Sequence, residues 1–482
     1  MKKVDKMVFS SSLFIFMFLP IALGVYFSVP FRYKSLIILL FSYLFYGWWR
    51  IDYLALLFLV TLWSYSFGKL IYVERTAQAR KRLLIVAISG PLLVLGYFKY
   101  CNFFMDSLAD LFNGGAPFTS WHARILLPIG ISFYIFQAIS YLIDIYREDA
   151  PPAQNFFDFA AFKALFPQLV AGPVLRYKDL ARQFTYREHS LELFAEGGIR
   201  FFAGLAKKVL IADSVAPIAD AIFAKADPTF AEAWLGTIAY SIQLYFDFSG
   251  YSSMAIGLGM MMGFRFIENF DCPYISRSIT EFWRRWHLSL SAWLRDYLYI
   301  PLGGNRLGTA RTYFNLFITM VLGGLWHGAN WTFILWGVWH GGLLALERVL
   351  GITPSDKRSL VALGGTLVLV MLGWVMFRSL DVHSAVDMYR GMSGLNGFHI
   401  QPDIAWQIKN FALASLAVGV AVVFIEPWFN RTFPAERLIH MPRHPSTAGF
   451  ALAATGIVCF FGMISILKLT ADNDSPFLYF QF

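Results

Sequence analysis

Long apolar stretches, separated by short polar loops, follow one another along the whole chain. Five of them contain no charged residue, namely residues 7–31, 125–143, 312–346, 359–377 and 446–467. An α-helix needs about 20 mostly apolar residues to cross the hydrocarbon core of a bilayer. Each stretch is near or above that length, and the third is long enough for two short spans. The pattern therefore predicts an all-α, polytopic membrane protein.

Hydropathy along the sequence indicates about twelve spanning or near-spanning helices. The polar stretches between them are too short to form an independent core, and the sequence shows no internal repeat. We therefore expect one membrane-embedded domain over residues 1–482. The expected helices are residues 8–28, 35–49, 53–73, 83–99, 124–146, 198–222, 233–262, 310–327, 330–350, 359–378, 409–427 and 447–468.

Composition supports this assignment and excludes other classes of protein. The chain has 482 residues, of which 57% are hydrophobic and only 15% are Asp, Glu, Lys or Arg. Soluble domains carry about 25% charged residues. The net charge of +9 would favour nucleic-acid binding in a soluble protein, but the basic residues lie mainly in short loops. We expect them to orient the protein in the membrane, and we expect no nucleic-acid partner.

The loops also predict an orientation. Residues 74–82 form the most basic early loop and are expected to face the cytoplasm, where Lys and Arg are enriched. Counting back three helices places the N-terminus in the periplasm. Lys2, Lys3 and Lys6 favour the opposite orientation.

Motifs for several other chemistries are missing from the sequence. The three cysteines are odd in number and far apart, which predicts neither a disulfide framework nor a zinc site. There is no G-x-S-x-G, H-E-x-x-H or P-loop motif. No third ligand accompanies His287 and His327 at a spacing typical of metal sites, so we expect no bound metal or cofactor.

Polar residues interrupt an apolar segment at residues 243–252, which read QLYFDFSGYS. A carboxylate such as that of Asp247 is costly inside a membrane unless it is paired or faces water. Asp247 is therefore a candidate for supporting a substrate. The alternative is that it caps or pins helices.

A second polar region follows at residues 281–297, where five charged residues argue against a lipid-facing span. At 100° per residue, one side of a helix would carry Arg284, His287, Ser291 and Arg295. Such a stripe fits a helix that lies at the membrane interface or lines a wet cavity. The alternative is a basic amphipathic helix that binds anionic lipid, with the histidine satisfied by its neighbours.

His327 lies inside the longest uncharged stretch, among glycines that let helices approach closely. A neutral imidazole accepts a proton near physiological pH, and a histidine within a membrane segment marks a functional site by default. His327 is thus a candidate general base, with interhelical hydrogen bonding as the alternative. His340 follows thirteen residues later, about 220° around an unbroken helix, so we expect it at most to support the site.

Several motifs occur together, in the same order, in one known family. They are MVFSS at residues 7–11, LPIGISFYIF at 127–136, AGPVLRYKDL at 171–180, LYFDFSGYS at 244–252, EFWRRWHLSLS at 281–291, GGLWHGAN at 323–330 and SPFLYFQF at 475–482. Through these motifs, which cover most of the chain, the sequence resembles the membrane-bound O-acyltransferase superfamily. Within it, the sequence is similar to the bacterial alginate O-acetylase (AlgI-like) branch.

The resemblance implies a polytopic helical bundle with an intramembrane tunnel, some interfacial or re-entrant helices, and a catalytic core at about residues 240–345. It maps the family's catalytic histidine to His327 and its second important polar position to His287. Similar proteins move acyl groups from a cytoplasmic thioester to periplasmic acceptors, so acetyl-CoA is the expected donor. The residues expected to support the substrate or the oxyanion are Arg284, Asn330, Asp247 and Asp296, with His340 behind the site.

The resemblance also implies a location and partners. We expect a multi-pass protein of the bacterial inner membrane that acetylates an exopolysaccharide, with alginate as the first choice. Periplasmic or membrane-anchored acetyltransferases and a polysaccharide secretion complex are the expected partners. The polar stretch 428–445 is shorter than its counterpart in the alginate enzymes, so cellulose or another polymer is an alternative.

Other interpretations stay open at this point. His327 is expected either to act as a general base or to carry the acetyl group transiently. A transporter or a non-catalytic scaffold is a different interpretation of the same polar centre, although the two related halves typical of transporters are missing. The phenylalanine-rich residues 476–482 are expected to pack back onto the bundle, because exposed they would favour aggregation.

Overall fold

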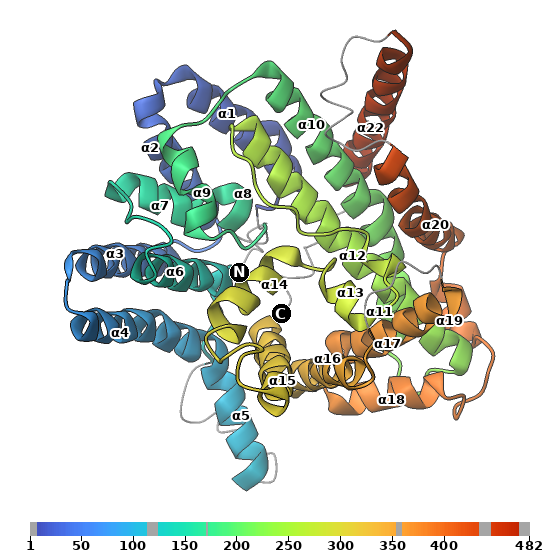
Figure 1. Cartoon of the computed structure of the whole chain (residues 1–482). Helices are drawn as coiled ribbons and strands as arrows, with labels where there is room; N and C mark the ends of the chain where they lie inside the picture. Colours follow the sequence, from blue (N-terminus) through green and yellow to red (C-terminus); the bar gives the residue numbers. More distant parts are fainter. Residues whose placement is uncertain (1–6, 113–123, 170–171, 353–358, 433–444, 472–482) are drawn as a thin grey trace. The chain divides into compact units, whose positions relative to one another are not determined.

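The computed structural model describes residues 7–112, 124–169, 172–352, 359–432 and 445–471, with side chains described outside residues 429–454. Every regular element in these ranges is a helix, so the all-α prediction is confirmed (Figure 1). The chain divides into two compact units, Met1–Ser190 with Leu258–Ile267 and Leu191–Gly257 with Glu268–Phe482. The single domain over residues 1–482 stays a prediction, and residues 476–482 lie outside the described residues.

The first unit contains the amino-terminal helices. Its α6 (Ile131–Tyr146) begins later than the expected residue 124, because Gly130 directly before it is left-handed with a φ of 72°. The other elements of this unit are η1 (Phe14–Phe18), α1 (Leu19–Ser28), α2 (Phe31–Gly47), α3 (Asp52–Val73), α4 (Ala77–Leu95), η2 (Gly96–Tyr100), α5 (Cys101–Phe112), α7 (Phe156–Ala164), α8 (Phe166–Leu169) and α9 (Tyr177–Thr185).

The second unit contains the motif-rich centre of the chain. Its longest element is α12 (Phe230–Met261), whose last turn belongs to the first unit. The other elements are α10 (Leu191–Ala206), η3 (Lys207–Ala212), α11 (Asp213–Phe223), η4 (Pro273–Ile275), α13 (Ile279–Trp283), α14 (Leu288–Leu294), η5 (Arg295–Tyr299), α15 (Thr309–His327), α16 (Trp331–Val349), α17 (Leu360–Arg378), α18 (Val382–Met392), α19 (Pro402–Gln407), α20 (Asn410–Thr432) and α22 (Pro445–Ala471). Each expected helix overlaps one or more of these elements.

Several helices have the length and composition of membrane spans. Within the described residues, four segments qualify: Asp52–Val73, Ala77–Phe112, Leu360–Arg378 and Asn410–Trp428. Large apolar side chains on them point away from the protein, as at Leu93 and Val361, which are 72% and 87% exposed. Lipid is the environment that accepts such a surface. The chain is a multi-pass membrane protein.

A buried ion pair fixes the middle of α12. Asp247 binds the Lys208 ammonium at 2.7 Å, and both side chains are only 2% exposed. Lys208 also binds Asp213. A buried charge is stable when it is paired in this way. The structure therefore favours the interpretation that Asp247 pins helices over a direct contact with substrate.

The helix hairpin of α15 and α16 organises the rest of the second unit. The two helices run antiparallel and side by side, joined by residues 328–330 (Figure 1). Their backbones approach so closely that a Cβ on Gly337 would lie 2.5 Å from the Met320 carbonyl oxygen. Small residues at such positions permit tight helix packing in membranes. His327 is the last residue of α15 and therefore lies at the closed end of this hairpin.

Residues 278–304 run along the hairpin and back, and we name them the re-entrant segment. At the open end of the hairpin, the Ile279 and Thr280 amides donate to the Glu347 carboxylate at 2.5 and 2.8 Å. At the closed end, the His287 ring lies 6.4 Å from the His327 ring between centroids. The segment returns along α15 to its open end, where Asn315 donates to the Gly304 carbonyl at 3.0 Å.

The expectation of one continuous helix through residues 281–297 is wrong. α13 ends at Trp283 and α14 starts at Leu288, with a left-handed residue, His287 (φ 45°), between them. The Leu288 amide bonds to the Asn269 carbonyl at 3.0 Å instead of continuing the helix. Because the helix is interrupted there, the four polar residues expected on one side do not form a common stripe.

The close approach of α10 and α12 yields a prediction about stability. A Cβ added at Gly250 would lie 2.7 Å from the Gly204 carbonyl oxygen, so the helices would have to separate. We expect Gly250→Ala to destabilise the protein by about 1–3 kcal/mol, as other overpacked sites do. The melting temperature of the purified protein, followed by size-exclusion chromatography after heating, measures this effect.

Gly198→Ala is the matched control, because a Cβ there meets nothing within 4 Å. Alanine has the higher helix propensity, so this variant should melt at or above the wild-type temperature. Equal melting temperatures for the two variants would contradict the close packing of α10 and α12.

Candidate active site

His327 projects into a cage of aromatic rings at the closed end of the hairpin. Its ring meets those of Trp326, Trp336 and Phe377 edge-on, at centroid distances of 5.1, 5.2 and 5.1 Å. The residue is only 6% exposed. The sequence motif therefore places the imidazole against apolar walls and away from bulk solvent.

The turn between α15 and α16 explains why His327 points there. A side chain at Gly328 would collide with the Phe333 ring. Asn330 caps α16 by accepting the Thr332 amide at 3.1 Å, and it donates to the Leu380 carbonyl at 2.8 Å. The Asn330 carboxamide thus holds the turn through both of its polar atoms, which differs from the expected support of a substrate or oxyanion.

A narrow pocket opens beside His327. It is too constricted to admit the centre of a water-sized sphere. All of its walls come from the second unit, and most of them are aromatic. The lining residues are Leu244, Phe248, Trp286, His327, Trp336, Trp374 and Phe377.

His287 is held at the turning point of the re-entrant segment, 1% exposed. Its Nδ1 donates to the Asn269 Oδ1 at 3.0 Å, and its ring meets Phe248 edge-on at 4.7 Å. The buried Nε2 atom has no hydrogen-bond partner within the described residues. A non-glycine residue in the left-handed region is strained, and such strain is concentrated at functional sites.

His340 lies on α16, behind the cage and completely buried. Its Nδ1 accepts a hydrogen bond from the Trp283 indole at 3.4 Å, and its ring centroid lies 5.1 Å from that of Trp336. Trp336 in turn contacts His327. The supporting role expected for His340 stays a prediction. α15 and α16 form a hairpin, and not the unbroken helix that was used to estimate the angle of His340.

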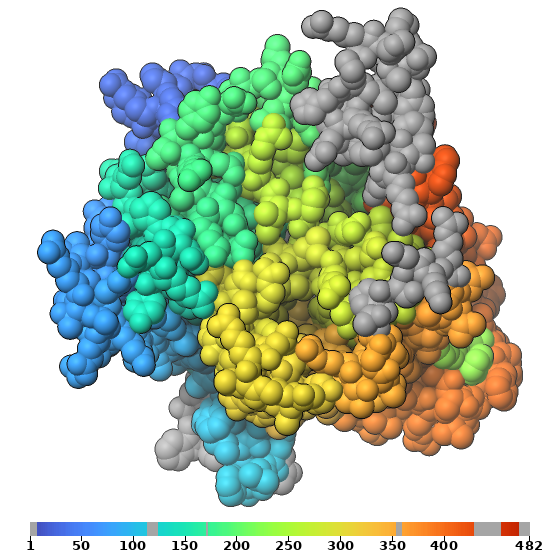
Figure 2. Space-filling view, viewed as in Figure 1, coloured from blue at the N-terminus to red at the C-terminus, as the bar shows by residue number. Residues whose placement is uncertain are grey.

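The remaining expected site residues lie apart from the pocket walls. Arg284 is exposed at the end of α13. Asp296 forms an ion pair with its neighbour Arg295, and both residues belong to η5. The part of the re-entrant segment that follows this pair leads to the surface of the protein. Yellow residues are visible there in Figure 2, and Leu307 is 62% exposed.

Sequence reasoning missed the residues that position the histidines. Asn269 and Glu347 bind the re-entrant segment from elsewhere in the chain, and Trp374 and Phe377 come from α17. The polar or aromatic character of these four residues did not mark them as part of the site, because the residues that they contact are distant in sequence. The histidine motifs themselves were sufficient to find His287 and His327.

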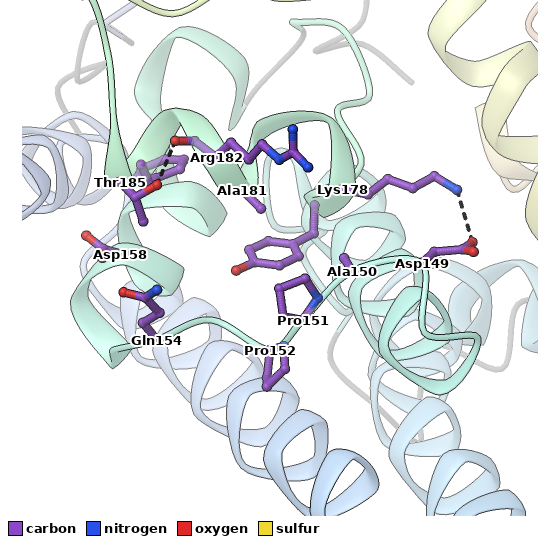
Figure 3. A pocket seen from close by; sticks show the side chains of 12 residues that line it. Asp149, Ala150, Pro151, Pro152, Gln154, Asp158, Lys178, Ala181, Arg182 and Thr185 are labelled. Carbon is purple, nitrogen blue, oxygen red and sulfur yellow. Dashed lines mark hydrogen bonds and ion pairs between the residues drawn. The ribbon is translucent and has the colours of Figure 1, made fainter.

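The first unit has a separate surface pocket of about 460 Å³ (Figure 3). Lys178 lies at its rim and is held by Asp149 at 3.3 Å. Arg182 and Thr185 line another part of the wall. None of the expected site residues lines this pocket.

Comparison with known proteins identifies the family. The family model described as MBOAT, membrane-bound O-acyltransferase family, matches residues 43–352, which include both histidines. The chain belongs to the membrane-bound O-acyltransferase family. The expected resemblance and the expected enzyme class, a membrane O-acyltransferase, are thereby confirmed.

Relatives of this membrane-bound O-acyltransferase match it over almost its full length. A protein named probable alginate O-acetylase AlgI from Pseudomonas putida is 50% identical over 99% of this chain and all of the relative. Its namesake from Azotobacter vinelandii is 51% identical, again over 99% of this chain and all of the relative. A peptidoglycan O-acetyltransferase from Helicobacter pylori is 34% identical over all of this chain and 98% of the relative.

The packing of His340 predicts an effect on the acyltransferase reaction. A Cβ added at Gly373 would lie 2.6 Å from the His340 Nε2, so Gly373→Ala would displace His340 and, through Trp336, the wall behind His327. A misplacement of about 1 Å can slow an enzyme about 100-fold. We expect acyl transfer by isolated membranes to fall at least tenfold, measured with a labelled acyl donor.

Gly365→Ala on the same helix is the control, because nothing lies within 4 Å of its added Cβ. It should keep wild-type activity. Full activity of a well-folded Gly373→Ala protein would show that His340 does not position the site.

Proposed function

We propose that the protein transfers an acetyl group from acetyl-CoA to hydroxyl groups of an exopolysaccharide, with alginate as the polymer. The observation that carries this proposal is the pairing of His287 and His327, 6.4 Å apart, beside a constricted aromatic pocket. The names of relatives that are about half identical over the full length support acetyl as the acyl group and alginate as the acceptor. Cellulose and other polymers remain the alternative acceptors.

In the proposed reaction, His327 acts as general base on the acceptor hydroxyl. The hydroxyl oxygen attacks the thioester carbonyl carbon while its proton passes to the imidazole, and a tetrahedral intermediate forms. The C–S bond then breaks, the ester carbonyl forms, and the thiolate takes the proton from His327. Protons and electrons balance within the two reactants, so no further co-reactant is needed.

The aromatic pocket suits this chemistry because it keeps water away from the thioester. Hydrolysis would compete with transfer wherever water reached the carbonyl carbon. The rings of Trp336 and Phe377 meet the His327 imidazole edge-on and take the place of water on those sides of it. Polar contacts made inside such apolar walls are also stronger than in water.

The second unit also suggests how the protein is oriented. Arg311 near the start of α15 and Arg348 near the end of α16 lie together at the open end of the hairpin. Basic residues at the ends of membrane helices favour the cytoplasmic side. We therefore place this end, where the donor would enter, in the cytoplasm. We propose the inner membrane as the location, and a periplasmic N-terminus on the separate ground of the basic loop at residues 74–82.

The acetylated product would leave on the periplasmic side. There, periplasmic or membrane-anchored acetyltransferases and the polysaccharide secretion complex are the proposed partners. We keep His287 at the reacting atoms, as expected. Of the expected substrate-supporting residues, we keep Arg284 as an exposed contact for the anionic donor. For Asp247, Asn330 and Asp296 we propose roles in holding the helices and turns.

The proposal predicts that His327→Ala abolishes acetylation. Removal of a general base typically costs about 10²–10⁴-fold in rate. The chain is expressed in an alginate-producing bacterium that lacks its own O-acetylase, and the acetyl content of the secreted polymer is measured. We expect acetylated alginate with the wild type and background levels with His327→Ala.

His383→Ala is the matched control, since His383 is an exposed histidine on α18. It should acetylate like the wild type. Undiminished acetylation by a well-folded His327→Ala protein would remove His327 as the catalyst. Acetylation of a different cell-surface polymer, with alginate unmodified, would reject alginate and leave the chemistry intact.

A further inference from the structure

Asn269 lies in the connection between α12 and η4 and is 1% exposed. Its Oδ1 accepts hydrogen bonds from the His287 Nδ1 at 3.0 Å, the Ser289 hydroxyl at 2.8 Å and the Ser289 amide at 3.3 Å. Its backbone carbonyl accepts the Leu288 amide at 3.0 Å. One residue therefore binds both the backbone and the side chains at the turning point of the re-entrant segment.

These bonds determine which nitrogen of His287 carries the proton. A backbone amide only donates, so the Asn269 atom that faces the Ser289 amide is the carboxamide oxygen. An oxygen acceptor requires a hydrogen on the His287 Nδ1. In the neutral ring, the Nε2 then has a free lone pair and no hydrogen.

The Nε2 atom is buried and has no protein partner within the described residues. The rings that face His287 are Phe248 of α12 and Trp326 and His327 of α15. His327 is the titratable group among them, and no ion pair of the described residues includes His287. A buried acceptor without a partner is costly, so a ligand that donates a hydrogen bond would be favoured here.

We infer that Asn269 is a positioning residue that fixes His287 as the Nδ1–H tautomer, so that its Nε2 accepts a hydrogen bond from a second hydroxyl of the acceptor sugar, next to the one that His327 deprotonates. The inference rests on the proposed function, since it orients the sugar whose hydroxyl His327 deprotonates. His287 directs the sugar while its ring is neutral, and in this role it does not stabilise the oxyanion. An oxyanion needs a donor, which this tautomer does not provide at the Nε2.

Two substitutions of Asn269 separate positioning from a purely structural role. Asn269→Ala removes the acceptor for the Nδ1–H and frees the ring to change tautomer. The rate at saturating donor should fall at least tenfold, with the KM for acetyl-CoA changed less than about threefold. Asn269→Asp keeps an oxygen in place but adds a negative charge that stabilises the protonated imidazole.

The aspartate variant therefore has a distinct signature. Protonation of His287 removes the Nε2 acceptor, so the acid limb of the pH–rate profile should move to higher pH by about one unit or more, with activity recovering at alkaline pH. Labelled acetyl-CoA and alginate oligomers are supplied to isolated membranes across a range of pH. A pH profile identical to that of the wild type would overturn the inference, even if Asn269→Ala proved unable to fold.

Ser276→Ala is the matched control. It removes a buried hydroxyl directly after η4, which donates to the Pro273 carbonyl at 2.7 Å and is not part of the Asn269 network, so activity should stay within about threefold of the wild type. A loss as large as that of Asn269→Ala would instead show that the effect is structural, and would overturn the inference. Acetylation by His327→Ala would overturn the proposed function itself, which keeps the two failures distinguishable.

Discussion

Backbone groups that leave regular helices inside a membrane protein need partners within the protein, because lipid offers none. The re-entrant segment meets this constraint through two residues from other parts of the chain, by the side chain of Glu347 and by both the backbone carbonyl and the side chain of Asn269. Glu347 accepts the amides at the start of α13. Asn269 accepts those of Leu288 and Ser289 at the turning point. The left-handed conformation of His287 persists because these bonds hold the residues around it, and the position of its imidazole depends on them.

The hairpin of α15 and α16 supplies the other half of the site by the opposite means, close apolar packing. Glycine positions bring the two backbones into contact, so the turn at Gly328 is tight and His327 meets the rings of Trp336 and Phe377 directly. Hydrogen bonds to the surrounding residues thus determine where His287 lies, and the close packing of α15 and α16 determines where His327 lies. The pocket beside His327 is narrow because the aromatic side chains that line it are closely packed.

Hydropathy was sufficient to predict the long apolar helices, because membrane spans are long and their apolar pattern is local. It did not predict shorter helices such as α7, α9 and α18. The motifs around His287 and His327 likewise identified both histidines. Periodicity failed at residues 281–297, since the 100° rule assumes a continuous helix and the Leu288 amide bonds instead to Asn269. Asn269 lies 18 residues before His287 in sequence, and Glu347 lies 68 residues after Ile279. Such pairings depend on the fold, and nothing in the local sequence marks them.

The buried ion pairs of Lys208 in the second unit have a role that is separate from the proposed reaction. In the proposed transfer, the proton of the acceptor hydroxyl ends on the leaving thiol, so one imidazole can carry it between the two reactants and no proton must cross the protein. Lys208 is bound by Asp247 and Asp213, which couples η3 to α12 and α11. Since the reaction requires no proton path there, the ion pairs are explained by helix packing alone. His287 and His327 then remain as the groups with chemistry to perform.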